Sequence, residues 1–202
     1  VSRVGIPPLI VTLGMCAITK GATLRISGGF TITGLPKSLG FFGQGYIERA
    51  PVPAIIFGVS IAVTYFVLNY TRFGRSAYAV GGNRVSASLC GINVPKTQFL
   101  AYVISGFTAA VAGIILMSRA MSASMFIAAN LELDSIASCV IGGISLAGGR
   151  GNIIGALIGV IIIGVINNGM NLAGIPHGMQ DVAKGAIIII AVAVDVFRTR
   201  RG

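Results

Sequence analysis

Long apolar stretches without charged residues alternate with shorter polar segments along the chain, and their lengths predict membrane-spanning helices. Residues 50–71 and residues 97–118 contain no Asp, Glu, Lys or Arg. Each stretch is long enough for one crossing, because a helix needs about 20 apolar residues to span the ~30 Å hydrocarbon core of a bilayer. Residues 151–180 are also free of these charges and predict one span followed by an outer turn.

Three shorter apolar segments, residues 6–19, 134–147 and 182–197, bring the expected number of spans to six. Lys184 and Asp195 lie near the ends of the last segment, where such side chains can reach the headgroup region. Gly142 and Gly143 interrupt the middle segment, which we expect to be a tilted or broken helix. If that segment were re-entrant, everything after it would change sides.

The segments between the spans differ in composition. Residues 21–49 are rich in Gly, Ser and Thr and predict an outer connection that starts directly after the first span. Residues 72–96 form the only sizeable inner loop, which carries four basic residues and no acid. A loop of that size on the inner side is a natural place for a cytoplasmic partner to dock.

The composition supports a membrane protein and excludes most soluble classes. The 202 residues are 54% hydrophobic and 10% charged, with a mean hydropathy of +0.90. A soluble globular domain carries about 25% charged residues because water must wet its surface. We therefore predict an all-α fold, a polytopic helical bundle in the membrane.

The excess of basic residues predicts an orientation. With six spans both ends face the same side, and that side collects nine of the 15 basic residues with Asp195 as the only nearby acid: Arg3, Arg72, Arg75, Arg84, Lys96, Arg150, Arg198, Arg200 and Arg201. By the positive-inside rule both ends are predicted to be cytoplasmic. The net charge of +10 is spread between apolar runs and not along one face, so no nucleic-acid partner is expected.

Small residues at helical spacing indicate that several helices pack together. Ser105, Ala109 and Gly113 repeat every four residues, and Gly155 and Gly159 form a second pair of this kind. Membrane helices associate through such small residues because lipid supplies no hydrophobic driving force between them.

The residues do not predict catalysis or a metal site. The one histidine, His177, lies in an outer turn without a second ligand at zinc-binding spacing, and a surface or interfacial position is expected for it. None of the four lysines has the glycine frame of an ATP-binding phosphate loop. The three cysteines are far apart in the sequence and predict neither a disulfide framework nor a metal site. We expect no catalytic residue, no metal and no cofactor bound by this chain.

Polar residues inside the predicted spans are the informative remainder, because burying them in hydrocarbon is costly unless they are paired or line a wet path. Asn167 and Asn171 share one helix face, and Asn168 is shifted by one position. One interpretation is a lining for a hydroxyl-rich solute; the other is hydrogen bonding between helices or a position at the outer interface. Glu132 and Asp134 begin a predicted helix, where they interact favourably with its dipole. Neither has an obvious basic partner in a neighbouring span, and a proton relay is the alternative role.

The inner loop contains a predicted short amphipathic helix. Asn83 can cap it, Val85, Leu89 and Ile92 share its apolar side, and Gly91 can end it. Such a helix, flanked by basic residues, either sits in a partner's cleft or lies on anionic headgroups. The pattern alone leaves both interpretations open.

Several longer motifs in fixed order carry a family resemblance. They are residues 71–75 (Thr-Arg-Phe-Gly-Arg), 78–83 (Tyr-Ala-Val-Gly-Gly-Asn), 90–94 (Cys-Gly-Ile-Asn-Val), 132–137 (Glu-Leu-Asp-Ser-Ile-Ala), 142–151 and 167–172 (Asn-Asn-Gly-Met-Asn-Leu). Together the chain resembles the permease subunit of bacterial ABC importers for monosaccharides, of the ribose, xylose and arabinose type. Residues 124–130 depart from the family pattern, which usually has a Gly-, Pro- or Thr-containing turn there.

The resemblance implies a fold of about ten transmembrane helices, of which this chain corresponds to the last six. The chain starts at Val1 without Met, and we expect residues 1–202 to be one transmembrane permease domain from an N-terminally truncated fragment. Residues 72–96 would be its cytoplasmic coupling loop, and the residues expected to contact the ATPase are Arg75, Gly81, Gly82, Asn83, Arg84, Ala87, Leu89, Gly91 and Ile92. Asn167, Asn168 and Asn171 would lie near the solute path.

The resemblance also implies partners and a mechanism. We expect cytoplasmic ATP-binding subunits that use the ATP, a periplasmic or extracellular sugar-binding protein, a second permease copy in a homodimer, and the lipid of the bacterial inner membrane. The sugar would cross by alternating access. The alternatives are a permease for branched-chain amino acids and an ion-coupled secondary transporter.

Overall fold

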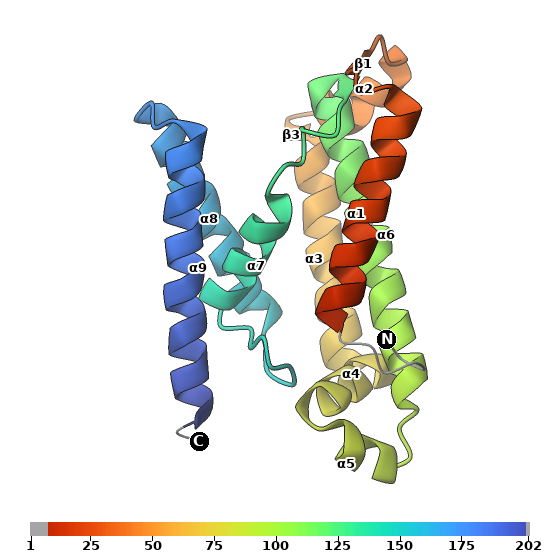
Figure 1. Ribbon diagram of the computed structural model, residues 1–202. Helices are drawn as coiled ribbons and strands as arrows, with labels where there is room; N and C mark the ends of the chain where they lie inside the picture. Colours follow the sequence, from red (N-terminus) through yellow and green to blue (C-terminus); the bar gives the residue numbers. More distant parts are fainter. Residues whose placement is uncertain (1–7, 201–202) are drawn as a thin grey trace. The chain divides into compact units, whose positions relative to one another are not determined.

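The computed structural model describes residues 8–200 and confirms a fold built almost entirely from helices (Figure 1). In chain order the helices are α1 (Pro8–Ser27), α2 (Lys37–Gln44), α3 (Val52–Tyr70), α4 (Arg72–Gly82), α5 (Arg84–Leu89), α6 (Val94–Ala120), α7 (Leu131–Ile141), α8 (Ile153–Leu172) and α9 (His177–Arg200). Four two-residue strands form two antiparallel pairs: β1 (Ile32–Thr33) with β4 (Ser122–Ala123), and β2 (Tyr46–Ile47) with β3 (Ala50–Pro51).

The three longer predicted spans are confirmed. Among the described residues, α3, α6 and α8 are long and apolar enough to cross a membrane. Their apolar side chains remain largely uncovered in this chain: Val103 is 49% exposed, Phe107 is 69% exposed and Ile161 is 56% exposed. An apolar surface of this extent needs lipid or protein against it.

The first predicted span was placed too short. α1 runs through Gly21 and Lys20 to Ser27, so the first seven residues of the predicted outer connection are helical. The hydroxyl of Thr19 donates to the carbonyl of Met15 at 2.9 Å, and the hydroxyl of Thr23 donates to the carbonyl of Thr19 at 2.9 Å. These bonds satisfy polar side chains within the helix, which ends only where the backbone turns left-handed at Gly28 (φ +62°).

The segment with the glycine interruption is a broken helix. α7 has 11 residues, which at a rise of 1.5 Å per residue span roughly 16 Å, about half of the hydrocarbon core. The helix ends at Gly142, and Gly143 has a positive φ of +80°. Residues 142–152 are irregular before α8 begins.

α9 starts five residues before the predicted segment and has 24 residues. The earlier start places Lys184 two turns inside the helix. The predictions for the side chains of His177 and Asp195, and those for Arg3 and Arg201, lie outside the described residues.

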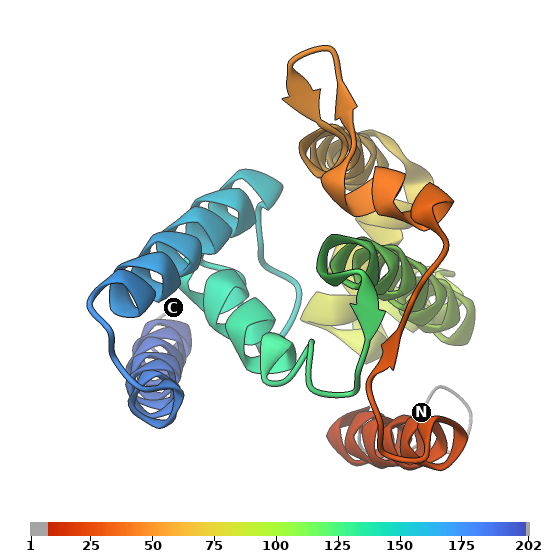
Figure 2. The same cartoon turned by 90° about the horizontal axis from the view of Figure 1, so that it is seen from above.

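The chain divides into two compact units. The first contains α1, α2, α3 and α6; α1 and α6 run in one direction and α3 in the other, and α6 lies between the other two in the view from above (Figures 1 and 2). The short helix α2 lies across the end where α3 begins and α6 finishes. Its Gln44 donates from Nε2 to the carbonyl of Arg119 at 3.0 Å, and the fully buried hydroxyl of Ser118 donates to the carbonyl of Leu39.

The second unit contains α5, α7, α8, α9 and most of α4. α7 packs against both α8 and α9, which are antiparallel to each other (Figure 1). The close approach of α7 to α8 depends on the predicted glycine pair, because a Cβ atom on Gly155 would clash with the carbonyl oxygen of Gly142 and one on Gly159 with the carbonyl oxygen of Ser138. The other predicted stripe, Ser105, Ala109 and Gly113, is exposed, and its role in packing stays a prediction.

Candidate functional site

The predicted inner loop, residues 72–96, is mostly helical, and we call it the coupling elbow. α4 follows α3 after a single residue, α5 follows α4 at Asn83, and α6 begins at Val94. The predicted cap is confirmed: Oδ1 of Asn83 accepts hydrogen bonds from the backbone N–H groups of Val85 at 2.9 Å and Ser86 at 3.0 Å. Gly91 has a φ of +78°, a conformation that glycine adopts at little cost.

The coupling elbow exposes apolar and basic side chains. On α5 the side chains of Val85 and Leu89, one turn apart, are 71% and 84% exposed, whereas Ala87 is buried. Ile92 is half-buried. The basic residues of this segment are all exposed and no acidic residue separates them: Arg72, Arg75, Arg84 and Lys96.

One side of α4 is held against residues 142–151. The hydroxyl of Tyr78 donates to the carbonyl of Gly151 at 3.1 Å. A Cβ atom placed on Gly81 would lie only 2.6 Å from the backbone nitrogen of Gly149, whereas one on Gly82 would have 4.0 Å to its nearest neighbour. Gly148 and Gly149 have positive φ angles of +92° and +73°. We call Gly81, Gly148 and Gly149 the glycine contact.

A second group of candidate residues lies between α7, α8 and α9, and we call Asp134, Asn167 and Lys184 the polar cluster. Nζ of Lys184 lies 3.0 Å from Oδ1 of Asp134 and 3.1 Å from its Oδ2. Nδ2 of Asn167 donates to Oδ2 of Asp134 at 3.1 Å. The side chains of Lys184 and Asp134 are 13% and 18% exposed, so the ion pair is largely removed from solvent within the unit.

The ion pair corrects the sequence prediction that Asp134 has no obvious basic partner. Lys184 was assigned to the start of a span, where it would reach the headgroups. Because α9 begins at His177, Lys184 faces the first turn of α7 instead.

The three asparagines of α8 have different surroundings. Asn167 and Asn171 bond to other segments of the unit, Asn171 by accepting from Nε2 of Gln180 at 3.0 Å. Gln180 is buried and also donates to the carbonyl of Ile175 at 2.8 Å. Asn168 is exposed. Oδ1 of Asn167 is buried without a hydrogen-bond partner. A position for these amides near a solute path stays a prediction.

Sequence inspection missed four residues that hold these sites together: Tyr78, Asn130, Gln180 and Lys184. Asn130 donates from Nδ2 to Oδ2 of Asp181 at 3.1 Å and adds a further tie between the start of α7 and the start of α9. A signal was present for α9, since Lys184 lies four residues after Gln180 and three after Asp181, which places it beside both on a helix. Tyr78 begins the family motif at residues 78–83, but nothing in that motif indicated its bond to Gly151.

Neither site has the composition of a catalytic or metal centre. Within the described part of the chain, no three His, Cys, Asp or Glu side chains come together to hold a metal ion. The polar cluster has one carboxylate, one ammonium and one amide, which can orient hydroxyl groups or hold helices together.

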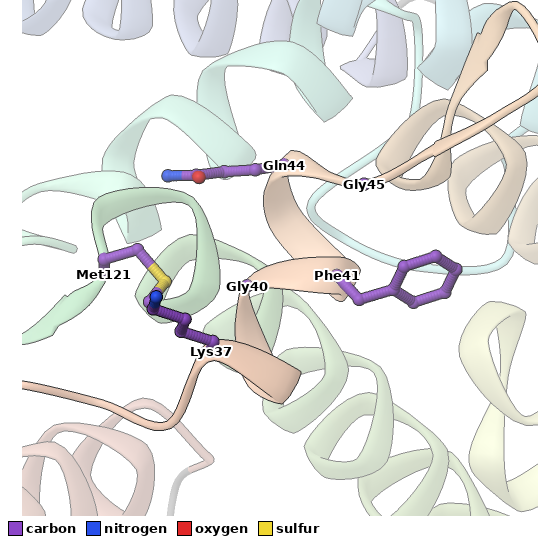
Figure 3. Close-up of a pocket in the computed structure, with 6 residues that line it drawn as sticks. All are labelled: Lys37, Gly40, Phe41, Gln44, Gly45 and Met121. Carbon is purple, nitrogen blue, oxygen red and sulfur yellow. The ribbon is translucent and has the colours of Figure 1, made fainter.

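Described residues of the first unit line two hollows. An open groove of about 420 Å³ is lined by Lys37, Gly40, Phe41, Gln44, Gly45 and Met121. In Figure 3 the side chains of Lys37 and Met121 lie together, while the ring of Phe41 points away from them. The second hollow, of about 240 Å³, lies between α1, α6 and residues 122–128 and has no charged side chain in its lining. Neither was predicted from the sequence.

Comparison with protein families gives one match over nearly the whole chain. Residues 1–192 match the family described as "Branched-chain amino acid transport system / permease component". No solved structure matches the chain significantly.

The most similar curated proteins include two ribose import permeases and a xylose permease. The ribose import permease protein of Bacillus subtilis (strain 168) is 45% identical over 190 residues, which cover 93% of this chain and 59% of the relative. The ribose import permease protein of Escherichia coli (strain K12) is 39% identical over 199 residues, or 96% of this chain and 62% of the relative. The xylose transport system permease protein of Haemophilus influenzae is 41% identical over 151 residues, or 75% and 40%. The chain thus spans about 60% of the length of its first relatives.

Proposed function

The chain belongs to the permease-component family of branched-chain amino acid transport systems, and on that premise we propose that it is the membrane-spanning part of an ABC importer for a monosaccharide. Membership of the family and the three apolar helices make it a multi-pass membrane protein with a transport role. The sugar, the partners, the location in a bacterial inner membrane and the cytoplasmic position of both ends belong to the proposal.

The choice of a sugar over an amino acid has two supports. The similar curated proteins are named for ribose import, xylose transport and D-allose transport, at 37–45% identity. The polar cluster adds a physical argument, because an amino-acid substrate brings a carboxylate that favours a cation or a helix N-terminus. Lys184 is already paired with Asp134, whereas the amides of α8 suit hydroxyl groups. The same pairing gives no support to ion-coupled transport through Asp134.

The exposed α5 helix is the observation that carries ATP coupling. Val85 and Leu89 expose apolar side chains on the surface of the chain, and Arg84 and Arg75 lie close to them in the sequence. We propose that these side chains enter a cleft of a cytoplasmic ATP-binding subunit, which hydrolyses the ATP, while this chain carries no catalytic group. Asn83 and Gly91 set the two ends of the inserted helix.

Solute would pass along the bundle by alternating access, with the amides at positions 167, 168 and 171 close to its route. Asn168 is the member whose side chain is exposed, so it is the one we propose to meet the solute directly. A second permease copy and an external sugar-binding protein complete the proposed complex.

Reconstitution tests this function. The full-length protein that contains this chain is placed in proteoliposomes with its ATP-binding subunit and binding protein, and uptake of labelled ribose, xylose, allose and leucine is measured. We expect ATP-dependent uptake of one of the sugars and none of leucine. Leucine uptake would overturn the substrate class. Uptake driven by a proton gradient without nucleotide would overturn ATP coupling.

A further inference from the structure

Residues 74–89 of the coupling elbow belong to the second unit and touch the rest of that unit at the glycine contact. The two segments approach so closely that a Cβ on Gly81 would meet the nitrogen of Gly149 at 2.6 Å, and a Cβ on Gly149 would meet Cα of Gly82 at 2.5 Å. The backbones therefore lie directly against each other. A backbone contact of this kind transmits displacement well, because no flexible side chain lies between the two segments to absorb it.

The contact is reinforced by one directed bond. Tyr78 lies on α4 one turn before Gly82, and its hydroxyl donates to the carbonyl of Gly151. The residue is half-buried, and its neighbour on the same helix, Val80, is buried. Steric contact resists approach of the two segments, and the hydrogen bond resists their separation.

On the elbow side, α4 and α5 are joined by Asn83. Its backbone N–H donates to the carbonyl of Ala79 at 3.0 Å and so extends the bonding of α4. Its side chain caps α5. A displacement of α5 therefore acts on α4 through a single residue that belongs to the hydrogen bonding of both helices.

On the opposite side, residues 142–151 are continuous with α7 and α8. The N–H of Ser145 donates to the carbonyl of Arg150 at 3.1 Å and closes the segment on itself. Asn152 follows and caps α8 by accepting from the N–H of Ile154 at 3.0 Å. At the beginning of the segment, Gly142 lies so close to α8 that a Cβ atom on it would clash with the backbone of Gly155. A push on Gly149 therefore reaches the start of α8 and the end of α7 together.

We propose that residues 148–151 are the receiver through which movement of α5 reaches α7 and α8, with Gly81 and Tyr78 as the positioning residues of the elbow. The inference rests on the proposed function, since it assumes that a partner moves α5. The inference goes beyond the proposed function by naming the residues at which the movement of α5 reaches the other helices.

The test compares substitutions in the reconstituted transporter by the number of ATP molecules hydrolysed per solute taken up. Gly81→Ala places a methyl group against the backbone of Gly149, and we expect this ratio to rise about tenfold, within the usual range of coupling factors. Gly82→Ala is the matched comparison on the same helix end, with 4.0 Å of space, and should raise the ratio several-fold less. Gly106→Ala on α6 adds a methyl group where no atom lies within 4 Å and should leave the ratio at the wild-type value.

Tyr78→Phe is the second, milder variant, which removes one hydroxyl and retains the ring. Loss of a single hydrogen bond should raise the ratio about threefold, while assembly with the ATP-binding subunit and ATP hydrolysis in detergent remain at wild-type levels. If the Gly81→Ala variant does not assemble, the ratio measured for Tyr78→Phe tests the receiver by itself.

The outcomes separate the two proposals. A wild-type complex that takes up no sugar with ATP contradicts the proposed function. A wild-type complex that transports normally, with Gly81→Ala no worse than Gly82→Ala and Tyr78→Phe equal to wild type, overturns the receiver.

Discussion

Two contacts of the second unit, the glycine contact and the polar cluster, hold its parts together in different ways. At the glycine contact the backbones of α4 and residues 148–149 lie directly against each other, and no charged side chain takes part. At the polar cluster α7, α8 and α9 are joined by long side chains, one ion pair and one amide. The first contact tolerates almost no added volume, and the second tolerates almost no loss of a partner. The glycine contact suits a segment that transmits motion, and the polar cluster suits helices that stay together.

The energetic reasons for the two contacts differ in the same way. Helices in lipid gain nothing from hiding apolar surface from each other, so close packing and polar bonds must supply the association. Close packing at Gly155 and Gly159 brings α7 to α8, but a stack of glycines has no directional bond. Between α7 and α8 the hydrogen bond from Asn167 to Asp134 supplies one. The ion pair ties Asp134 on α7 to Lys184 on α9 as well, provided that both charges remain paired.

The largest effect expected is from removing the cation of the polar cluster. Lys184→Met leaves the carboxylate of Asp134 largely buried beside one amide, and loss of one partner of a buried ion pair costs about 3–5 kcal/mol. The loss of stability is measured by unfolding the protein in detergent and comparing the denaturant midpoint or Tm with that of the wild type. Lys96→Met, at an exposed lysine, is the control. The double variant Asp134→Asn/Lys184→Met should recover most of the loss, and a double variant no better than Lys184→Met would contradict the pairing.

Added volume at the α7–α8 contact should have the next largest effect. Gly159→Ala forces a methyl group onto the carbonyl of Ser138, and overpacking of this kind costs about 1–3 kcal/mol. Gly164→Ala on the same helix meets no atom within 4 Å and should be neutral, or stabilising by about 0.5 kcal/mol through better helix propensity. The same unfolding assay compares them; equal midpoints for the two variants would refute the close approach.

Loss of the cap on α5 should be smaller and local. Asn83→Ala removes the acceptor for the N–H groups of Val85 and Ser86, at a cost of about 1 kcal/mol. Hydrogen exchange should show faster exchange in α5 with no change in α8. Ser88→Ala, on an exposed residue of the same helix, is the control. Protection in α5 that survives Asn83→Ala would contradict the role of the cap in holding this helix.

The smallest effect distinguishes two neighbouring asparagines. Asn171→Ala breaks the bond to Gln180, and a polar bond between membrane segments contributes about 0.6 kcal/mol on average. Asn168→Ala removes an exposed amide and should leave the unfolding midpoint unchanged while it weakens the apparent affinity for solute. A result in which Asn168→Ala destabilises more than Asn171→Ala would reverse the roles assigned here.

Features encoded within a few residues were predictable from the sequence. The spans α3, α6 and α8 follow from runs of apolar residues long enough to cross a bilayer, and Asn83 and Gly91 follow from known preferences at helix ends. The glycine break after α7 was also expected, because two adjacent glycines rarely continue a helix.

Features that depend on where helices meet were not predictable. Lys184 was given to the headgroups because a partner in α7 becomes visible only once α9 is known to start at His177. The first span was predicted to end at residue 19, but Thr19 and Thr23 find partners within α1, which continues to Ser27. The sequence gives no reason to distinguish Gly81 from Gly82. Only the structure shows that Gly149 leaves no room for a Cβ atom on Gly81 but does leave room for one on Gly82.

The half-length of α7 has a consequence for water in the membrane. Residues 142–152 continue from it without helical bonding, and peptide groups of this kind do not lie against lipid tails, since they would have nothing to bond to there. The peptide groups of residues 142–152 must therefore contact water or be covered by protein. A cysteine introduced at Ser145 should react with a membrane-impermeant thiol reagent added to one side of a vesicle, in contrast to one introduced at Phe107.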